Sequence, residues 1–156
     1  MKIFLDTADT AVIEKHFSSG LIDGITTNPT LIMKSGRNPE DVYQELIDLG
    51  IPDISMEVVG TREQMLWEGR RLANKFNKEA TIKVPCTPDG LYVCRQLSRS
   101  LVKVNVTLIF SPSQAILAAK AGATYVSPFV GRLDDNSVNG LDVISDISEI
   151  FSKHWI

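Results

Sequence analysis

A regular alternation of short apolar runs with longer amphipathic stretches constrains the fold of this chain most. Six runs have the length and composition of buried strands, and they are residues 2–6, 21–26, 54–59, 80–85, 102–110 and 124–128. Six stretches have the spacing of amphipathic helices, and they are residues 7–20, 38–50, 61–76, 88–100, 111–122 and 141–155. Strands that return through helices lie parallel and are joined by right-handed crossovers. The sequence therefore predicts an α/β protein with about six β-α units.

Two architectures share this alternation, a doubly wound open sheet and a (β/α)8 barrel of the TIM type. The glycine motifs that bind phosphate in many open sheets do not follow the first run. Polar residues instead occur at or near the C-terminal ends of the runs, and they are Asp6, Asn28, Glu57, Lys83, Asn105, Thr107 and Ser127. In a closed barrel such side chains point to one axis. We therefore expect a single barrel-type domain over residues 1–156.

Lys83 lies between Ile82 and Val84 in the fourth run. A charged amine is costly to bury, so this lysine either marks a sheet edge, where it discourages aggregation, or it is functional. Because side chains alternate along a strand, Ile82 and Val84 are expected to face the helices while Lys83 faces the axis. A poorly solvated amine can attack a carbonyl and form an imine. The polar residues on the other runs favour this second interpretation.

Lysine imine chemistry makes demands on its neighbours. The imine withdraws electrons and permits cleavage of a nearby C–C bond, which needs a carboxylate base and a second acid or base acting through water. Asp6 and Glu57 suit these two tasks, and the planar guanidinium of Arg132 suits a terminal phosphate. The side chains suited to sugar hydroxyls are Asn28, Asn105, Thr107 and Ser127. On the fifth run, alternation predicts that Val104, Val106 and Leu108 face away from Asn105 and Thr107.

The composition excludes several other classes of function. The net charge is −3, which argues against nucleic acid or a membrane surface as the main partner. Apolar runs fall short of the ~18 residues of a membrane span. Cys86 and Cys94 form no zinc or redox pattern and indicate reduced thiols in a cytoplasm, and we expect no metal or cofactor. Trp67 and Trp155 are expected to pack against the fold, and residues 70–71 to form a solvated basic face.

Several motifs together resemble the transaldolase family, in particular its small bacterial and phage-type members. They are LDTAD, GITTNPTL, MEV, IKVP, NVTLIFS and AGATYVSPFVGRLDD, and the resemblance runs from Met1 to the end of the chain. It implies a (β/α)8 class I aldolase of the pentose phosphate pathway. Such an enzyme transfers a dihydroxyacetone unit from fructose 6-phosphate or sedoheptulose 7-phosphate to an aldose phosphate. It does so through a lysine imine and without a cofactor.

The resemblance implies a role for each of these residues. Lys83 matches the imine-forming lysine, and Asp6 matches the acid/base at the hydroxyl of the cleaved bond. The other matches are Glu57 and Thr107 for the catalytic water, Asn28, Asn105 and Ser127 for the dihydroxyacetone unit, and Arg132 for the phosphate. The related fructose-6-phosphate aldolases release free dihydroxyacetone, and they typically carry glutamine at the position of Glu57 and tyrosine at that of Phe129. These two residues therefore favour a transaldolase.

The sequence shows six β-α units where the family has eight, so the C-terminal part is lacking. A second polypeptide or an exchanged segment could supply the rest, the chain could be a fragment, or the strands could form an open sheet. Exposed sheet edges invite pairing, so we expect a homo-oligomer or strand exchange with another chain. A non-catalytic subunit that binds sugar phosphates or assists assembly is a further alternative.

Overall fold

The computed structural model describes residues 1–155, apart from the side chains of residues 34 and 35. Its six strands are β1 (Phe4–Asp6), β2 (Gly24–Thr26), β3 (Ile54–Glu57), β4 (Ala80–Pro85), β5 (Lys103–Ile109) and β6 (Tyr125–Pro128). They pair in chain order, β1-β2-β3-β4-β5-β6. A doubly wound sheet would reverse its order at a switch point, whereas consecutive units of a (β/α)8 barrel keep chain order. The predicted fold class is therefore confirmed.

Helices follow each of the six strands, and most of them begin at a side chain that caps their first turn. The helices are α1 (Thr10–Phe17), α2 (Pro29–Ser35), α3 (Pro39–Asp48), α4 (Arg62–Phe76), α5 (Pro88–Arg99), α6 (Pro112–Ala121), α7 (Val130–Asp135) and α8 (Gly140–His154). A short 3-10 turn, η1 (Asn77–Glu79), precedes β4. Asp9, Asn38 and Thr87 accept hydrogen bonds from the first backbone N–H groups of α1, α3 and α5. The six predicted helices are confirmed, and their ends differ from the prediction by at most three residues.

Two short helices were not predicted from the sequence. Helix α2 begins at Pro29, with Asn28 as its N-cap, and ends at Gly36 in the left-handed conformation. Helix α7 follows Phe129 and has Leu133 as its buried residue. Both are too short to show helical periodicity in the sequence.

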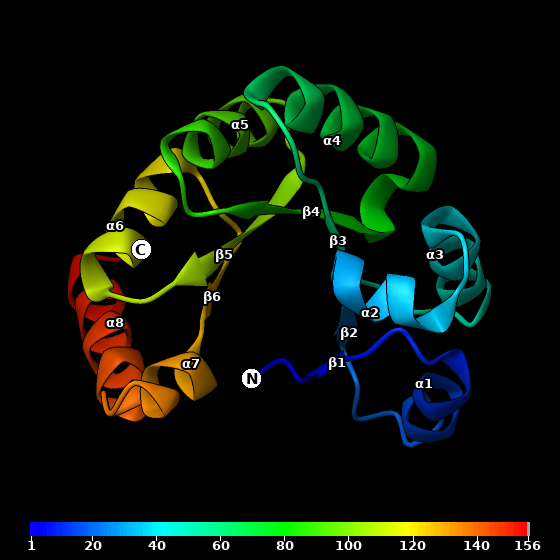
Figure 1. Ribbon diagram of the computed structural model, residues 1–156, viewed down its shortest axis with the longest axis horizontal. Coiled ribbons are helices and arrows are strands. Elements are labelled where there is room, and N and C mark those ends of the chain that lie inside the picture. Colours follow the sequence, from blue (N-terminus) through cyan, green and yellow to red (C-terminus); the bar gives the residue numbers. More distant parts are fainter. Residues whose placement is uncertain (156) are drawn as a thin grey trace. The chain divides into compact units, whose positions relative to one another are not determined.

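The described chain forms two compact units, and their boundary falls within β4 (Figure 1). Unit 1 comprises residues 1–58 and 68–82, and unit 2 comprises residues 59–67 and 83 onwards. In unit 1, β1 pairs in parallel with β2 and β2 with β3. The fully buried side chains of this unit include Ile13, Ile25, Leu46, Ile51, Ile54 and Met56. Its core is therefore the layer between the strands and the helices α1 and α3.

Unit 2 is organised around the parallel pair β5–β6. Helices α5 and α6 pack against these strands, and α8 packs against α6 and α7. The buried residues Val93, Cys94 and Leu97 come from α5, Val104, Val106 and Ile109 from β5, and Ala115 and Ala118 from α6. The apolar faces of α5 and α6 thus cover one side of β5.

Two predictions about the surface need correction. Trp67 is 65% exposed and Trp155 is 95% exposed, so neither packs into the core.

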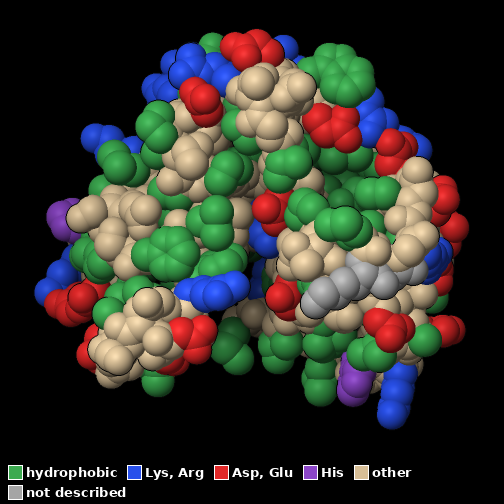
Figure 2. All heavy atoms as spheres, in the orientation of Figure 1, with side chains coloured by type: hydrophobic (Ala, Val, Ile, Leu, Met, Phe, Trp, Pro, Cys, Tyr) green, Lys and Arg blue, Asp and Glu red, His purple; other side chains and the backbone are tan. Residues whose placement is uncertain are grey.

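Lys and Arg side chains are interspersed with Asp and Glu on the face drawn in Figure 2, which accords with the small net charge. Among the described residues, none of the helices has the length and apolar character needed to cross a membrane.

Candidate active site

Lys83 is a buried residue of β4, with 6% of its surface exposed, and its neighbours Ile82 and Val84 are fully buried. Strand β4 has β3 as one neighbour and β5 as the other. A lysine that guards a sheet edge would lie on an outermost strand. The edge explanation for Lys83 is therefore wrong, and the observed burial is what an imine-forming amine requires.

The strands β5 and β6 carry a buried polar layer in unit 2. Asn105 is 3% exposed and Thr107 is 1% exposed. Ser127 Oγ donates a hydrogen bond to Asn105 Oδ1 at 2.8 Å. This bond orients the amide of Asn105 beside the hydroxyl of Ser127. The structure thus brings together two of the residues that were predicted to hold the substrate.

Thr107 has a buried hydroxyl that lacks a partner within the described part of the chain. Its backbone is well held, since the Cys86 N–H donates to the Thr107 carbonyl at 2.8 Å. Buried hydroxyl groups nearly always have a hydrogen-bond partner from the protein, a water or a ligand. The Thr107 hydroxyl therefore has unused capacity for a water or a substrate oxygen.

Phe129 and Arg132 follow the C-terminal end of β6. Phe129 directly precedes α7, and its ring meets the Phe110 ring edge to face, with centroids 5.7 Å apart. Arg132 lies on α7 with an exposed side chain, while Leu133 anchors the helix. Phe129 lies directly after the last residue of β6, Pro128. Arg132 has the exposure that binding an external phosphate requires.

In unit 1, Asp6 is the last residue of β1 and lies directly opposite Thr26 of β2. Thr26 Oγ1 donates a hydrogen bond to Asp6 Oδ1 at 2.8 Å. A carboxylate held by a hydroxyl donor has one oxygen oriented and the other available. Thr26 is a site residue that sequence reasoning missed, because the pairing register that opposes it to Asp6 is not visible in the sequence.

Asn28 has a structural task as well as its predicted one. Its Oδ1 accepts a hydrogen bond from the Leu31 N–H at 2.9 Å and so caps α2. The preceding Thr27 donates from Oγ1 to the Ser55 carbonyl at 2.9 Å, which ties the end of β2 to β3. The position of Asn28 is therefore determined by both the helix and the sheet.

Glu57 ends β3 and lines a pocket of about 200 Å³ in unit 1. The other residues that line it are Pro29, Ile32, Asn38, Pro39, Glu40, Tyr43, Glu68 and Leu72. Its walls thus combine apolar side chains from α2, α3 and α4 with three carboxylates. A pocket of this size has room for several waters, because one water occupies about 30 Å³ of liquid.

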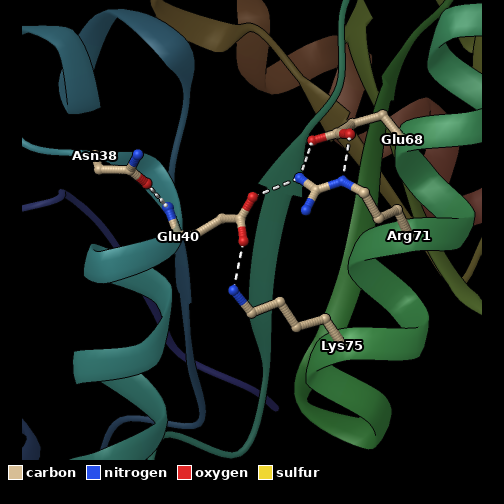
Figure 3. Close-up of polar contacts among 5 residues, drawn as sticks. All are labelled: Asn38, Glu40, Glu68, Arg71 and Lys75. Atoms are coloured by element: carbon tan, nitrogen blue, oxygen red, sulfur yellow. Dashed lines mark hydrogen bonds and ion pairs between the residues drawn. The ribbon is translucent and has the colours of Figure 1, made fainter.

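Two residues that line this pocket, Glu40 and Glu68, belong to an ion-pair network between α3 and α4. Figure 3 shows this network. Arg71 donates to both oxygens of Glu68, at 2.8 and 2.7 Å, and to Glu40 at 2.6 Å. Lys75 donates to the second oxygen of Glu40. Hydrogen bonds from Arg71 and Lys75 lower the pKa of Glu40 to about 2. The prediction that residues 70–71 form a simple solvated face is wrong for Arg71.

Tyr43 is another residue of this pocket that sequence reasoning missed. It is 4% exposed, and its ring meets the Phe76 ring edge to face, with centroids 5.9 Å apart. Burial raises the pKa of the Tyr43 hydroxyl, and a hydrogen bond with Thr27 partly offsets this effect. The negative charges of nearby glutamates, Glu57 foremost, raise the pKa further. The Tyr43 hydroxyl is therefore protonated at neutral pH.

The remaining polar chemistry of the chain is modest. Cys86 and Cys94 are both free thiols, and burial raises the pKa of each, for Cys94 to about 11. Both are therefore protonated at neutral pH. Within residues 1–155, no group of three His, Cys, Asp or Glu side chains is arranged to hold a metal ion. That the reaction needs no metal or cofactor stays a prediction.

Comparisons with known proteins identify the family. The family model described as Transaldolase/Fructose-6-phosphate aldolase matches residues 3–156. The chain is 51% identical over 155 residues to a probable transaldolase of Nitrosopumilus maritimus (strain SCM1), which covers 99% of this chain and 69% of that protein. It is 54% identical over 155 residues to a probable transaldolase of Geobacter sulfurreducens (strain ATCC 51573 / DSM 12127 / PCA), which covers 99% of this chain and 72% of that protein. The chain therefore belongs to the transaldolase/fructose-6-phosphate aldolase family.

Proposed function

We propose that this chain is a transaldolase in which Lys83 forms the imine. The observation that supports this most is the burial of Lys83 on an inner strand, with a polar layer of Asn105 and Ser127 in the same unit. The substrates are sugar phosphates, with fructose 6-phosphate or sedoheptulose 7-phosphate as donors. A location in the cytoplasm and a homo-oligomer or strand-exchanged assembly belong to the same proposal, as does one barrel-type domain over residues 1–156.

The reaction begins when the Lys83 amine adds to the ketose carbonyl and loss of water gives the imine. Asp6 takes the proton of the hydroxyl on the carbon to be released. The neighbouring C–C bond breaks, its electron pair moves into the imine as an enamine, and the aldose phosphate leaves as an aldehyde. The enamine then adds to a second aldose phosphate. Hydrolysis of the new imine by water returns Lys83 to its starting state.

Other residues hold the reacting groups in this proposal. Glu57 and Thr107 serve the water that is lost and added, and the unpartnered Thr107 hydroxyl supports this role. The amides of Asn28 and Asn105 and the hydroxyl of Ser127 bind the dihydroxyacetone unit. Arg132 binds the phosphate, and Phe129 lines the donor position with an apolar ring.

Trapping the imine tests the proposal directly. Borohydride is added to the protein with fructose 6-phosphate, and the adduct is located by intact mass and peptide mapping. We expect a reduced adduct on Lys83, which Lys83→Met abolishes. Lys120→Met, on the exposed side of α6, is the matched control and keeps the adduct. A well-folded protein without an adduct, or an adduct that persists in Lys83→Met, would refute the role of Lys83.

A second measurement separates transfer from release. With erythrose 4-phosphate as acceptor, a transaldolase forms sedoheptulose 7-phosphate, whereas a fructose-6-phosphate aldolase liberates free dihydroxyacetone. We expect transfer, because Glu57 and Phe129 differ from the residues typical of the aldolases. Free dihydroxyacetone as the main product would instead assign the chain to the aldolase side of the family. Binding of fructose 6-phosphate without any imine would indicate a non-catalytic subunit.

A further inference from the structure

Strand β5 contains a one-residue bulge next to Thr107. In the β5–β6 pair, Val106 lies opposite Val126, but Ile109 lies opposite Pro128. Two residues of β5, Thr107 and Leu108, therefore face the single residue Ser127. Leu108 has φ 60°, in the left-handed region that glycine adopts readily and a bulky side chain rarely does. Bulges of this kind re-aim side chains and recur beside active sites.

The bulge resets the alternation of the strand. Residues that pair across parallel strands share a face, so Val106 and Ile109 both lie on the face of Val126 and Pro128. In a regular strand, Ile109 would instead follow Asn105 and Thr107 on the polar face. The extra residue keeps the fully buried Ile109 in the core beneath the helices. The prediction that Leu108 continues the helix-facing row is therefore wrong.

The Leu108 side chain does not explain the strained backbone. It is 39% exposed, so little burial compensates for the left-handed conformation. Strained residues persist where the surrounding structure demands them, and they gather at functional sites. The residue directly before Leu108 is Thr107, with its buried and unpartnered hydroxyl. The strain and the unpartnered hydroxyl are independent observations that meet at adjacent residues.

We propose that Leu108 is a positioning residue whose left-handed backbone aims the Thr107 hydroxyl away from protein partners, so that it can hold the reaction water. The inference rests on the proposed function and adds to it a residue outside the set named above. The backbone conformation of Leu108 carries the role, and its side chain does not. Substitutions that differ in their tolerance of the left-handed region therefore separate the two.

Three variants at Leu108 make the comparison. Leu108→Gly accepts φ above zero without strain, and Leu108→Ala removes most of the side chain. We expect both to keep kcat within about threefold of the original protein. Leu108→Val places a β-branched residue in the left-handed region, so we expect kcat to fall about 100-fold with little change in KM. Equal losses in Leu108→Ala and Leu108→Val, or full activity in Leu108→Val, would overturn the proposal.

Leu101 provides a matched control. It also has a left-handed backbone, with φ 61°, but it is 94% exposed and lies before β5, at the end away from Thr107. Leu101→Val introduces the same local strain without affecting the bulge. We expect it to lower the urea midpoint as Leu108→Val does while kcat stays within about twofold. A matching fall in kcat would show that Leu108→Val acts through general stability, against the proposal.

A double-mutant cycle tests whether Leu108 acts through Thr107. If it does, Thr107→Val and Leu108→Val each lower kcat, and the double variant loses little more than Thr107→Val alone. Independent effects would multiply and would contradict the proposal.

A structural comparison decides the matter apart from activity. If the original protein forms no adduct on Lys83, the proposed function fails, but the positioning role of Leu108 can still be tested. Crystal structures of the original protein and of Leu108→Val then show whether the bulge sets the position of the Thr107 hydroxyl. A shifted Thr107 hydroxyl and an altered β5–β6 register in the variant support the positioning role. Unchanged places for Thr107 and Ile109 overturn it. If Leu108→Val does not fold, the crystal structure of Leu108→Ala is compared with the original protein instead. Because we expect alanine to keep the left-handed backbone, a shifted Thr107 hydroxyl in Leu108→Ala would contradict the proposal.

Discussion

Thr26 Oγ1 donates a hydrogen bond to Asp6 Oδ1 at 2.8 Å, and the two residues are directly opposed in the β1–β2 pair. The bond orients the carboxylate that is proposed to accept the substrate proton. We expect Thr26→Val to lower kcat about tenfold, since a hydrogen bond to a charged group is lost. Thr26→Ser keeps the hydroxyl and should restore most of the activity in the coupled assay. If Thr26→Val were as active as the original protein, the hydrogen bond from Thr26 would not be needed to orient Asp6.

Thr107→Val should stabilise the protein and lower its activity. Valine has the shape of threonine without the hydroxyl, so it removes the burial cost of a polar atom that has no partner among the described residues. We expect the free energy of unfolding to rise by about 1 kcal/mol and kcat to fall about 100-fold. Urea unfolding and steady-state kinetics on Thr107→Val and Thr107→Ser measure both effects. Unchanged stability would mean that an ordered water already satisfies the hydroxyl.

Glu40 should make the stability of the protein sensitive to acid. Its pKa is lowered from 4.5 to about 2 by Arg71 and Lys75, so its ion pairs stabilise the fold fully above pH 4.5. That contribution is lost as the pH falls from about 4.5 towards 2, because the unfolded chain takes up the proton first. We expect Glu40→Gln to cost about 1 kcal/mol at pH 7, the upper range for partly solvated pairs.

The control for this effect is the exposed pair of Lys153 and Glu149 on α8. Glu149→Gln removes a carboxylate from one solvated ion pair and should cost well under 1 kcal/mol. The difference between Glu40→Gln and the original protein should shrink at pH 3. A difference that persists undiminished at low pH would contradict the assignment to charge.

Tyr43 should make the stability of the protein sensitive to alkali, whereas Glu40 makes it sensitive to acid. Its pKa is raised above 10 by burial and by neighbouring carboxylates, so the folded protein retains a proton that the unfolded chain loses. Its contribution is complete below pH 10 and declines as the pH rises beyond that value. The original protein should therefore lose stability between pH 9 and pH 11 more steeply than Tyr43→Phe. Tyr92→Phe, at a tyrosine that is 43% exposed and does not line this pocket, is the control substitution.

Most of the fold was predictable from the sequence because its signals are local. Asp9, Asn38 and Thr87 cap helices whose apolar residues repeat at helical spacing, and these helices were predicted. Helices α2 and α7 were missed because seven and six residues are too few to establish a period. The exposure of Trp67 and Trp155 was also missed, since residue type does not reveal what covers a helix face.

The candidate site was predictable only in its residue types. Lys83, Asp6 and Glu57 were recognised by the chemistry of their side chains and by their place at strand ends. Their supporting contacts were not, because Thr26 reaches Asp6 through the pairing register and Arg71 reaches Glu40 across two helices. Such contacts join residues far apart in the chain, and no local pattern encodes them.

The sequence by itself determined the α/β class, the six β-α units, the family and the buried row that contains Lys83, because these depend on periodicity and residue type. Only the tertiary structure decided that β4 is an inner strand, that Leu108 forms a bulge and that the Thr107 hydroxyl has no partner in the described residues. The physical reason is that strand order, register and hydrogen-bond satisfaction are properties of pairs of segments. They arise only when those segments pack together.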